Sequence, residues 1–109
     1  MADLLKAGLD PLILGLLDEH PDHGYSLMVR LQAITKIKVA DGSLYPALYR
    51  LERSGAIAGT WHSDGKRRRK IFSLTSEGRR QLERAKADWM DWVRALSGVF
   101  GKVSPAGGR

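Results

Sequence analysis

Five consecutive cations, Lys66-Arg67-Arg68-Arg69-Lys70, form the densest charge in this 109-residue sequence. The formal net charge of +6 falls to +1 without them. Such a run favours an anionic partner, usually nucleic acid or a membrane surface. Because side chains alternate along a strand, we expect Arg67 and Arg69 on one face and Arg68 and Lys70 on the other. The alternative is a solvated basic loop.

The remaining residue types offer little for catalysis. The chain has no cysteine, which excludes disulfides and thiolate chemistry. Two of its three histidines, His20 and His23, flank a proline in a predicted turn, where their spacing does not indicate a metal site. No motif suggests a nucleophile paired with a base. We therefore predict a protein that is not an enzyme, with no cofactor and no metal.

The sequence also gives no sign of a membrane protein. Residues 1–10 include Asp3, Lys6 and Asp10, so they form no apolar leader, and no stretch approaches about 20 apolar residues. A basic membrane-surface helix is disfavoured because the cation run lies in a predicted hairpin. We expect a cytoplasmic protein that does not bind membranes.

Three helices are predicted before the cation run. The first, over 10–19, opens with Asp10 as N-cap and Pro11 in its first turn. The second runs from about 23 to 35 on a helical apolar spacing, and a connector or brief strand follows at 35–41. The third is capped by Ser43 and ends before Gly55.

After Gly55 the pattern predicts a hairpin and a last helix. Ala56–Trp61 and Arg69–Leu74 are the strand candidates, joined by residues 62–66, whose Asp-Gly pair favours a turn. Thr75 caps a helix over about 76–100.

This order of elements predicts a mainly α fold with a small β-hairpin: a winged helix-turn-helix with a C-terminal dimerisation helix. We divide the chain into a DNA-binding domain at 1–75, a dimerisation helix at 76–100 and a disordered tail at 101–109.

Several short motifs resemble the PadR family of transcriptional regulators. The most specific is Gly42-Ser-Leu-Tyr-Pro-Ala-Leu-Tyr-Arg-Leu-Glu52, and it follows His23-Gly24-Tyr25 at the family's spacing. The resemblance continues through Trp61, Arg69-Lys70 and Leu74-Thr75, and covers roughly residues 9–80. The single last helix is similar to the compact branch of the family.

The resemblance implies a homodimeric repressor that a small, possibly aromatic, effector releases from duplex DNA. The third helix is expected in the major groove, with the hairpin as the wing. Tyr45 and Tyr49 either touch DNA or pack on the preceding helices. The candidate DNA contacts are Lys36, Lys38, Ser43, Leu44, Tyr45, Pro46, Tyr49, Arg50, Lys66, Arg67, Arg68 and Arg69.

The last helix carries a short heptad pattern that predicts a dimer interface. Its members are Leu82, Ala85, Trp89, Trp92, Leu96 and Val99. A two-fold dimer implies a pseudo-palindromic operator with half-sites about one DNA turn apart. Trp89 and Trp92 are either dimer core or an effector site, and the position of Trp89 after Gly78 resembles that of ligand-stacking tryptophans in the family.

A second class of function stays open. A winged helix can also serve as a protein-interaction module that binds no specific DNA sequence. The cation run argues against this alternative, since a protein-docking hairpin gains little from five adjacent positive charges.

Overall fold

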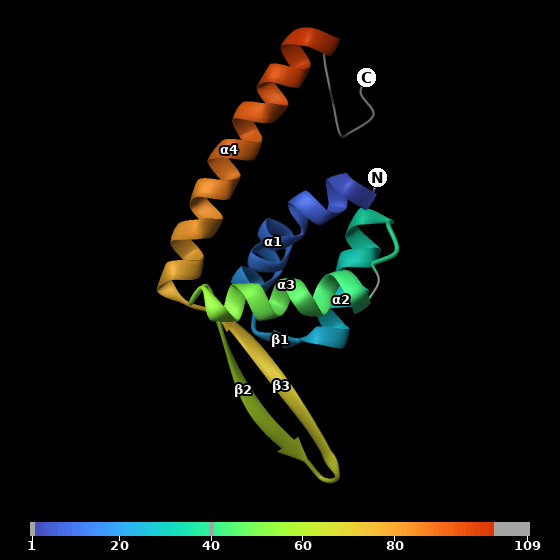
Figure 1. The fold of residues 1–109 in the computed structure, drawn as a ribbon, viewed down its shortest axis with the longest axis vertical. Helices are drawn as coiled ribbons and strands as arrows, with labels where there is room; N and C mark the ends of the chain where they lie inside the picture. The colour runs from blue at the N-terminus through green and yellow to red at the C-terminus, as the bar shows by residue number, and fades with distance from the viewer. Residues whose placement is uncertain (1, 40, 102–109) are drawn as a thin grey trace.

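The computed structural model describes the backbone of residues 2–39 and 41–101. Four helices and a small sheet make up this part of the chain (Figure 1), which confirms the mainly α winged-helix fold. The elements are α1 (Ala2–Glu19), β1 (Asp22–His23), α2 (Gly24–Thr35), α3 (Asp41–Arg53), β2 (Ile57–Asp64), β3 (Arg67–Leu74) and α4 (Ser76–Phe100). The wing, β2 with β3, and α4 leave the helical body in opposite directions.

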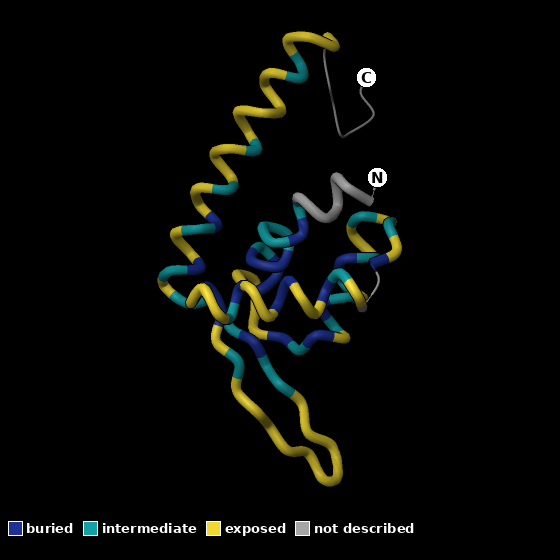
Figure 2. Tube along the Cα trace, viewed as in Figure 1, coloured by how far each residue is buried: buried dark blue, intermediate teal, exposed yellow. Residues whose placement is uncertain are grey.

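The core lies where α1, α2 and α3 meet the base of the wing. Each helix buries one apolar stripe, with members such as Ile13, Leu27 and Leu48 at most 2% exposed. Phe72 on β3 and Leu82 on α4 complete the same cluster. Figure 2 shows that burial ends near the base of the wing and in the first turns of α4, so both projections are largely exposed.

The wing is longer and its turn is tighter than we expected. The pairing of β2 with β3 runs from Ile57 opposite Leu74 to Asp64 opposite Arg67, which leaves a two-residue loop in place of the predicted five. Gly65 has a φ of 65°, as the first central residue of a type II′ turn requires. The prediction was wrong because this turn lets strand pairing continue into the cation run.

Two predicted helix starts were also wrong. The first helix begins at Ala2 rather than Asp10, and Pro11 lies inside it. Leu9, before the proline, is 2% exposed, and its burial helps to offset the backbone hydrogen bond that proline removes. The third helix begins at Asp41, so Ser43 is not its cap. Asp41 is acidic, and acidic residues are favoured in the first turn of a helix. Local sequence signals therefore did not distinguish a helix that starts at Asp41 from one capped by Ser43.

The last helix was predicted correctly over 76–100. The Thr75 hydroxyl accepts a hydrogen bond from the Gly78 N–H at 3.0 Å and caps α4. A Cβ at Gly78 would lie 2.0 Å from the carbonyl oxygen of Ala56, so only glycine lets α4 start this close to the wing base. Residues 102–109 of the predicted tail lie outside the described part of the chain.

A buried ionic network fixes the start of α2, which the sequence did not reveal. Asp22, 8% exposed, accepts hydrogen bonds from the His23 N–H (2.8 Å), Ser26 Oγ (2.6 Å) and Arg30 Nη1 (2.9 Å). Arg30 also binds Glu19 at 2.8 Å. Burial raises the pKa of Asp22, but the hydrogen bonds and the Arg30 charge outweigh it and hold that pKa below its ordinary value.

Candidate nucleic-acid interface

The outward face of α3 presents two of the predicted tyrosines. Tyr45 and Tyr49 are 47% and 61% exposed. Pro46 is exposed and Ser43 is half-buried. Leu44 is 0% exposed, so its place among the DNA contacts was wrong, since it belongs to the inner stripe of the helix.

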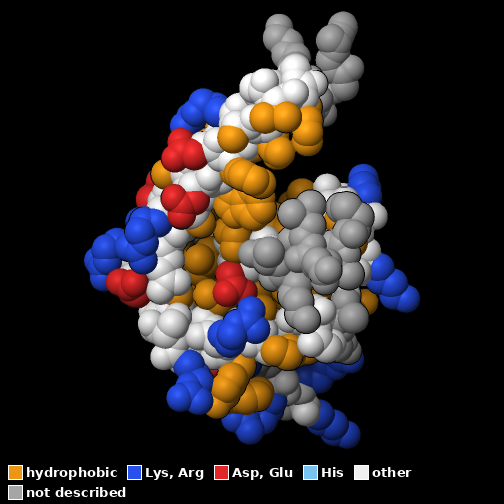
Figure 3. All heavy atoms as spheres, turned by 45° about the horizontal axis from the view of Figure 1, so that its top comes forward, with side chains coloured by type: hydrophobic (Ala, Val, Ile, Leu, Met, Phe, Trp, Pro, Cys, Tyr) orange, Lys and Arg blue, Asp and Glu red, His pale blue; other side chains and the backbone are white. Residues whose placement is uncertain are grey.

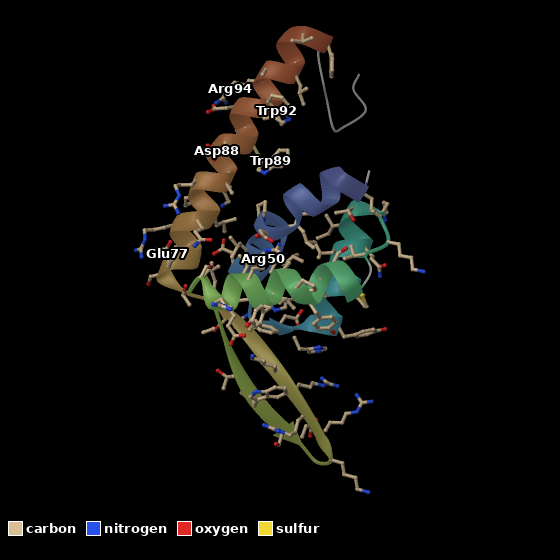
Figure 4. The ribbon with its side chains drawn as sticks, viewed as in Figure 1. Arg50, Glu77, Asp88, Trp89, Trp92 and Arg94 are labelled. Carbon is tan, nitrogen blue, oxygen red and sulfur yellow. The ribbon has the colours of Figure 1, made fainter. Side chains whose placement is uncertain are left out.

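The two arginines of α3 have different neighbours. Arg50 Nη2 lies 2.9 Å from Asp10 Oδ1 and turns toward α1 (Figure 4). Arg53, which was not among the predicted contacts, lies 5.6 Å above the Tyr49 ring and donates a hydrogen bond to its hydroxyl at 3.3 Å. Arg53 therefore extends the exposed tyrosine face, and its spacing of four residues from Tyr49 was the available signal.

The cation run divides between the two faces of the wing as alternation predicts. Lys70 lies opposite Trp61, and the Arg68 guanidinium lies 4.7 Å from the centroid of the Trp61 ring. Arg67 and Arg69 alternate with them along β3. All residues from 61 to 69 are exposed, so the wing presents its cations to solvent.

A groove of about 690 Å³ separates α3 from the wing. Tyrosines of α2 and α3 and aromatic and cationic residues of the wing line it, among them Tyr25, Tyr45, Tyr49, Trp61, Arg67 and Arg69. Tyr25, 63% exposed at the start of α2, was not among the predicted contacts. Residues of α2, α3 and the wing therefore line one groove.

Lys36 and Lys38 are exposed but do not line this groove. Lys36 ends α2 in the left-handed conformation with a φ of 62°, and its N–H binds the Gln32 carbonyl at 2.9 Å. This pair remains a prediction.

The two histidines near the start of α2 have local structural roles. The ring of His23 accepts a hydrogen bond from the Ser26 N–H at 3.4 Å and caps α2, while the ring of His20 lies 2.8 Å from the Pro21 carbonyl oxygen. Neither contact forms part of a catalytic pair.

The predicted heptad positions of α4 fall into two groups. Leu82 is buried within the chain's own core, and Ala85 and Trp89 are half-buried beside α1. Trp92 and Val99, by contrast, are 55% and 78% exposed, and Leu96, which lies between them in the heptad pattern, is half-buried. Figure 3 shows hydrophobic side chains along this side of α4.

Between α1 and α4 lies a second groove, of about 550 Å³. Its lining is mainly apolar and includes Leu12, Leu16, Ile37 and Trp89. Figure 4 shows Trp89 on the side of α4 that faces α1, with Trp92 farther along the helix.

A tri-helical core, a β-hairpin wing and a projecting last helix define a winged helix-turn-helix protein. The family model described as "Transcriptional regulator PadR-like family" matches residues 13–84, and the chain belongs to this family. The family and its solved structures are of transcriptional regulators, not enzymes.

Solved structures share this fold over nearly the whole chain. A PadR family regulator from Eggerthella lenta is 30% identical, with 94% of this chain and 89% of that chain covered and a TM-score of 0.80. A PadR-like regulator from Bacillus cereus is 27% identical, with 93% and 99% covered and a TM-score of 0.82. A regulator from Clostridium thermocellum is 26% identical, with 92% and 99% covered and a TM-score of 0.81.

A similar sequence also occurs as part of a larger protein. The chain is 36% identical over 73 residues to an uncharacterized 37.1 kDa transposon protein of Streptomyces fradiae. That match covers 67% of this chain but spans only 20% of the transposon protein. Among the described residues, no helix is both long and apolar enough to cross a membrane.

Proposed function

We propose that the chain binds duplex DNA with α3 in the major groove and the wing on the neighbouring backbone. The observation that carries this proposal is the groove between the two elements, which is lined by Tyr45 and Tyr49 of α3 and by Arg67 and Arg69 of the wing. A major groove about 12 Å wide accepts a helix, and the phosphate strand beside it then faces the cations.

The two elements have different tasks in this proposal. The wing supplies mainly electrostatic affinity, because arginines that meet phosphates do not read sequence. Residues 43–50 supply sequence preference through side chains that reach base edges. Arg50 can join them once it exchanges Asp10 for DNA.

The test is the salt dependence of binding to duplex DNA from upstream of the chain's own gene. Replacing Arg67 and Arg68 with alanine removes two wing cations and should lower the log–log slope by roughly 0.9 for each lost phosphate contact. The control, Arg80→Ala with Arg84→Ala, makes the same charge change on α4. A slope that stays unchanged in the wing variant would overturn this assignment.

We propose further that the active form is a homodimer joined through α4. The exposed apolar end of this helix, with Trp92, Val99 and Phe100 at 55%, 78% and 72% exposed, supports a second copy as its cover. Two-fold symmetry then gives a pseudo-palindromic operator with half-sites about one turn apart.

The proposed dimer is a repressor, acting on DNA in the cytoplasm, that a small aromatic effector releases. The apolar groove between α1 and α4 supports this part, since Trp89 offers a flat ring for stacking. Titration with planar cationic dyes and phenolic acids should quench Trp89 fluorescence and weaken DNA binding. With Trp89→Phe the quenching should be lost, whereas Trp92→Phe should retain it. If neither signal changes in the wild type, Trp89 has only a packing role.

The alternative function is a winged-helix module that binds proteins. The exposed cations of the wing favour DNA over this alternative. A gel shift on the upstream DNA separates the two, because a protein-binding module would leave the probe unshifted at every salt concentration.

A further inference from the structure

Lys70, the last cation of the basic run, is held by α3, the proposed recognition helix. Its Nζ lies 2.8 Å from Oε1 of Glu52 on α3, so the pair joins β3 to the helix across 18 residues of sequence. The two side chains are 30% and 31% exposed, whereas Arg67 and Arg69 are exposed residues. Lys70 therefore differs from the other wing cations in having a fixed partner within the chain.

Gly59 provides the space for this ion pair. A Cβ at residue 59 would lie 2.4 Å from Cε of Lys70 and 3.1 Å from Oε2 of Glu52. Glycine weakens a strand, and Gly59 has no positive φ that would demand it. Its place in β2 is explained by the close approach of the lysine side chain, which lies across the strand on its way to Glu52.

Two aromatic rings flank the same ammonium group. Lys70 Nζ lies 5.8 Å from the centroid of Trp61 and 5.6 Å from that of Phe72, within the range of a cation–π interaction. Phe72 is 7% exposed and belongs to the core, whereas Trp61 is 56% exposed on the wing. Lys70 thus links the core, the recognition helix and the free part of the wing at one point.

We propose that Glu52 and Lys70 are positioning residues that set the angle of the wing on α3, and that Lys70 is not a phosphate ligand. This inference rests on the proposed DNA-binding function. The proposal predicts that Glu52 favours DNA binding, although this side chain is acidic and lines the groove where DNA would lie. Without the pair, the two-stranded ribbon would be held only at its base, and an isolated ribbon is marginally ordered.

The distance from Lys70 to the turn of the wing explains why the angle between the wing and α3 matters. We call the Glu52–Lys70 ion pair the clamp. Lys66 lies four residues beyond Lys70 along β3, so at about 3.3 Å per residue the turn of the wing lies about 13 Å from the clamp. A rotation of about 20° at the clamp would move the turn by roughly 4 to 5 Å, more than the roughly 3 Å length of a hydrogen bond between a wing cation and a phosphate. A small loss of order at Lys70 would therefore misplace Arg67 and its neighbours.

The test sets Glu52→Gln against Asp64→Asn. Each change removes one negative charge, but Asp64 forms no ion pair within the described residues. If charge alone mattered, both variants would bind DNA more tightly. The clamp instead predicts that Asp64→Asn binds slightly more tightly and Glu52→Gln binds about three- to fivefold more weakly. Equal or tighter binding by Glu52→Gln would overturn the clamp.

The lysine side of the pair gives a second readout. Lys70→Gln should weaken binding about as much as Glu52→Gln and should change the log–log salt slope by the same amount, because both variants act only through the placement of the other wing cations. Exchanging the charges, Glu52→Lys with Lys70→Glu, should recover part of the loss. A slope that is lower by about 0.9 in Lys70→Gln than in Glu52→Gln, or no recovery on exchange, would assign Lys70 to phosphate.

A measurement without DNA separates failure of the clamp from failure of the DNA-binding proposal. Amide hydrogen exchange across residues 59–72 should be faster in Glu52→Gln and Lys70→Gln than in the wild type and Asp64→Asn. If the wild type binds no DNA, the proposed function fails, yet faster exchange would still support the clamp. Unchanged exchange in both clamp variants would overturn it, whatever the DNA result.

Discussion

The ring of Tyr45 occupies the space that a side chain at residue 24 would fill. A Cβ at Gly24 would lie 2.7 Å from Cε1 of Tyr45 and 3.1 Å from its hydroxyl oxygen. The tyrosine is nevertheless 47% exposed, so it both packs on α2 and faces the groove. DNA contact and packing on a preceding helix, which the sequence left as alternatives for Tyr45, are therefore compatible.

Gly24→Ala should displace Tyr45 and weaken DNA binding by about tenfold or less, with little change in the free energy of unfolding. Alanine favours the helix at this position, which offsets part of the local strain. The measurement is a binding titration of Gly24→Ala, Tyr45→Ala and the double variant. Because both changes act on one ring, their effects should not add.

Gly98→Ala serves as the matched control on α4, where nothing lies within 4 Å of a Cβ at residue 98. It should stabilise the helix by about 0.5–1 kcal/mol and leave DNA affinity unchanged. Additive losses from Gly24→Ala and Tyr45→Ala would show that the contact does not position the tyrosine.

Asp22→Asn should lower the free energy of unfolding at pH 7 by about 1–3 kcal/mol, since it removes an ionised acceptor from Ser26 and Arg30. The folded-state pKa of Asp22 lies below its ordinary value of 3.8, so the carboxylate's contribution is present above that pH. As the pH falls through the folded-state pKa, the contribution is lost.

Urea denaturation at pH 7 and at pH 3 should therefore show a difference between wild type and Asp22→Asn that shrinks in acid. Asp88→Asn, an exposed carboxylate on α4, should change the free energy by less than about 0.5 kcal/mol at both values. A difference that is the same at both pH values would mean that the ionised form of Asp22 is not what stabilises α2.

Val99→Asp should raise the dissociation constant of the proposed dimer by about tenfold or more, because it places an unpaired charge in an apolar interface. Sedimentation over a range of concentrations measures this change. Ala87→Asp, at an exposed position on another side of α4, should leave the association unchanged. Equal dissociation in both variants would place the interface elsewhere.

The sequence by itself determined the order of elements and the family. Thr75 marked the start of α4, and alternation along the cation run placed Arg68 and Lys70 on one face. These features depend on residues at most a few positions apart, and such spacings are what capping and periodicity report.

The tertiary structure alone decided which of these residues meet. Gly24 with Tyr45, Arg50 with Asp10 and Lys70 with Glu52 are pairs separated by 18 or more positions, and no local rule selects them. The strand β1 likewise depends on pairing with β3. The part of α1 that precedes Pro11 depends on the burial of Leu9 in the core. Packing of the helices on the wing base brings such residues together, because the free energy gained by burying apolar area depends on the whole arrangement and not on any one segment.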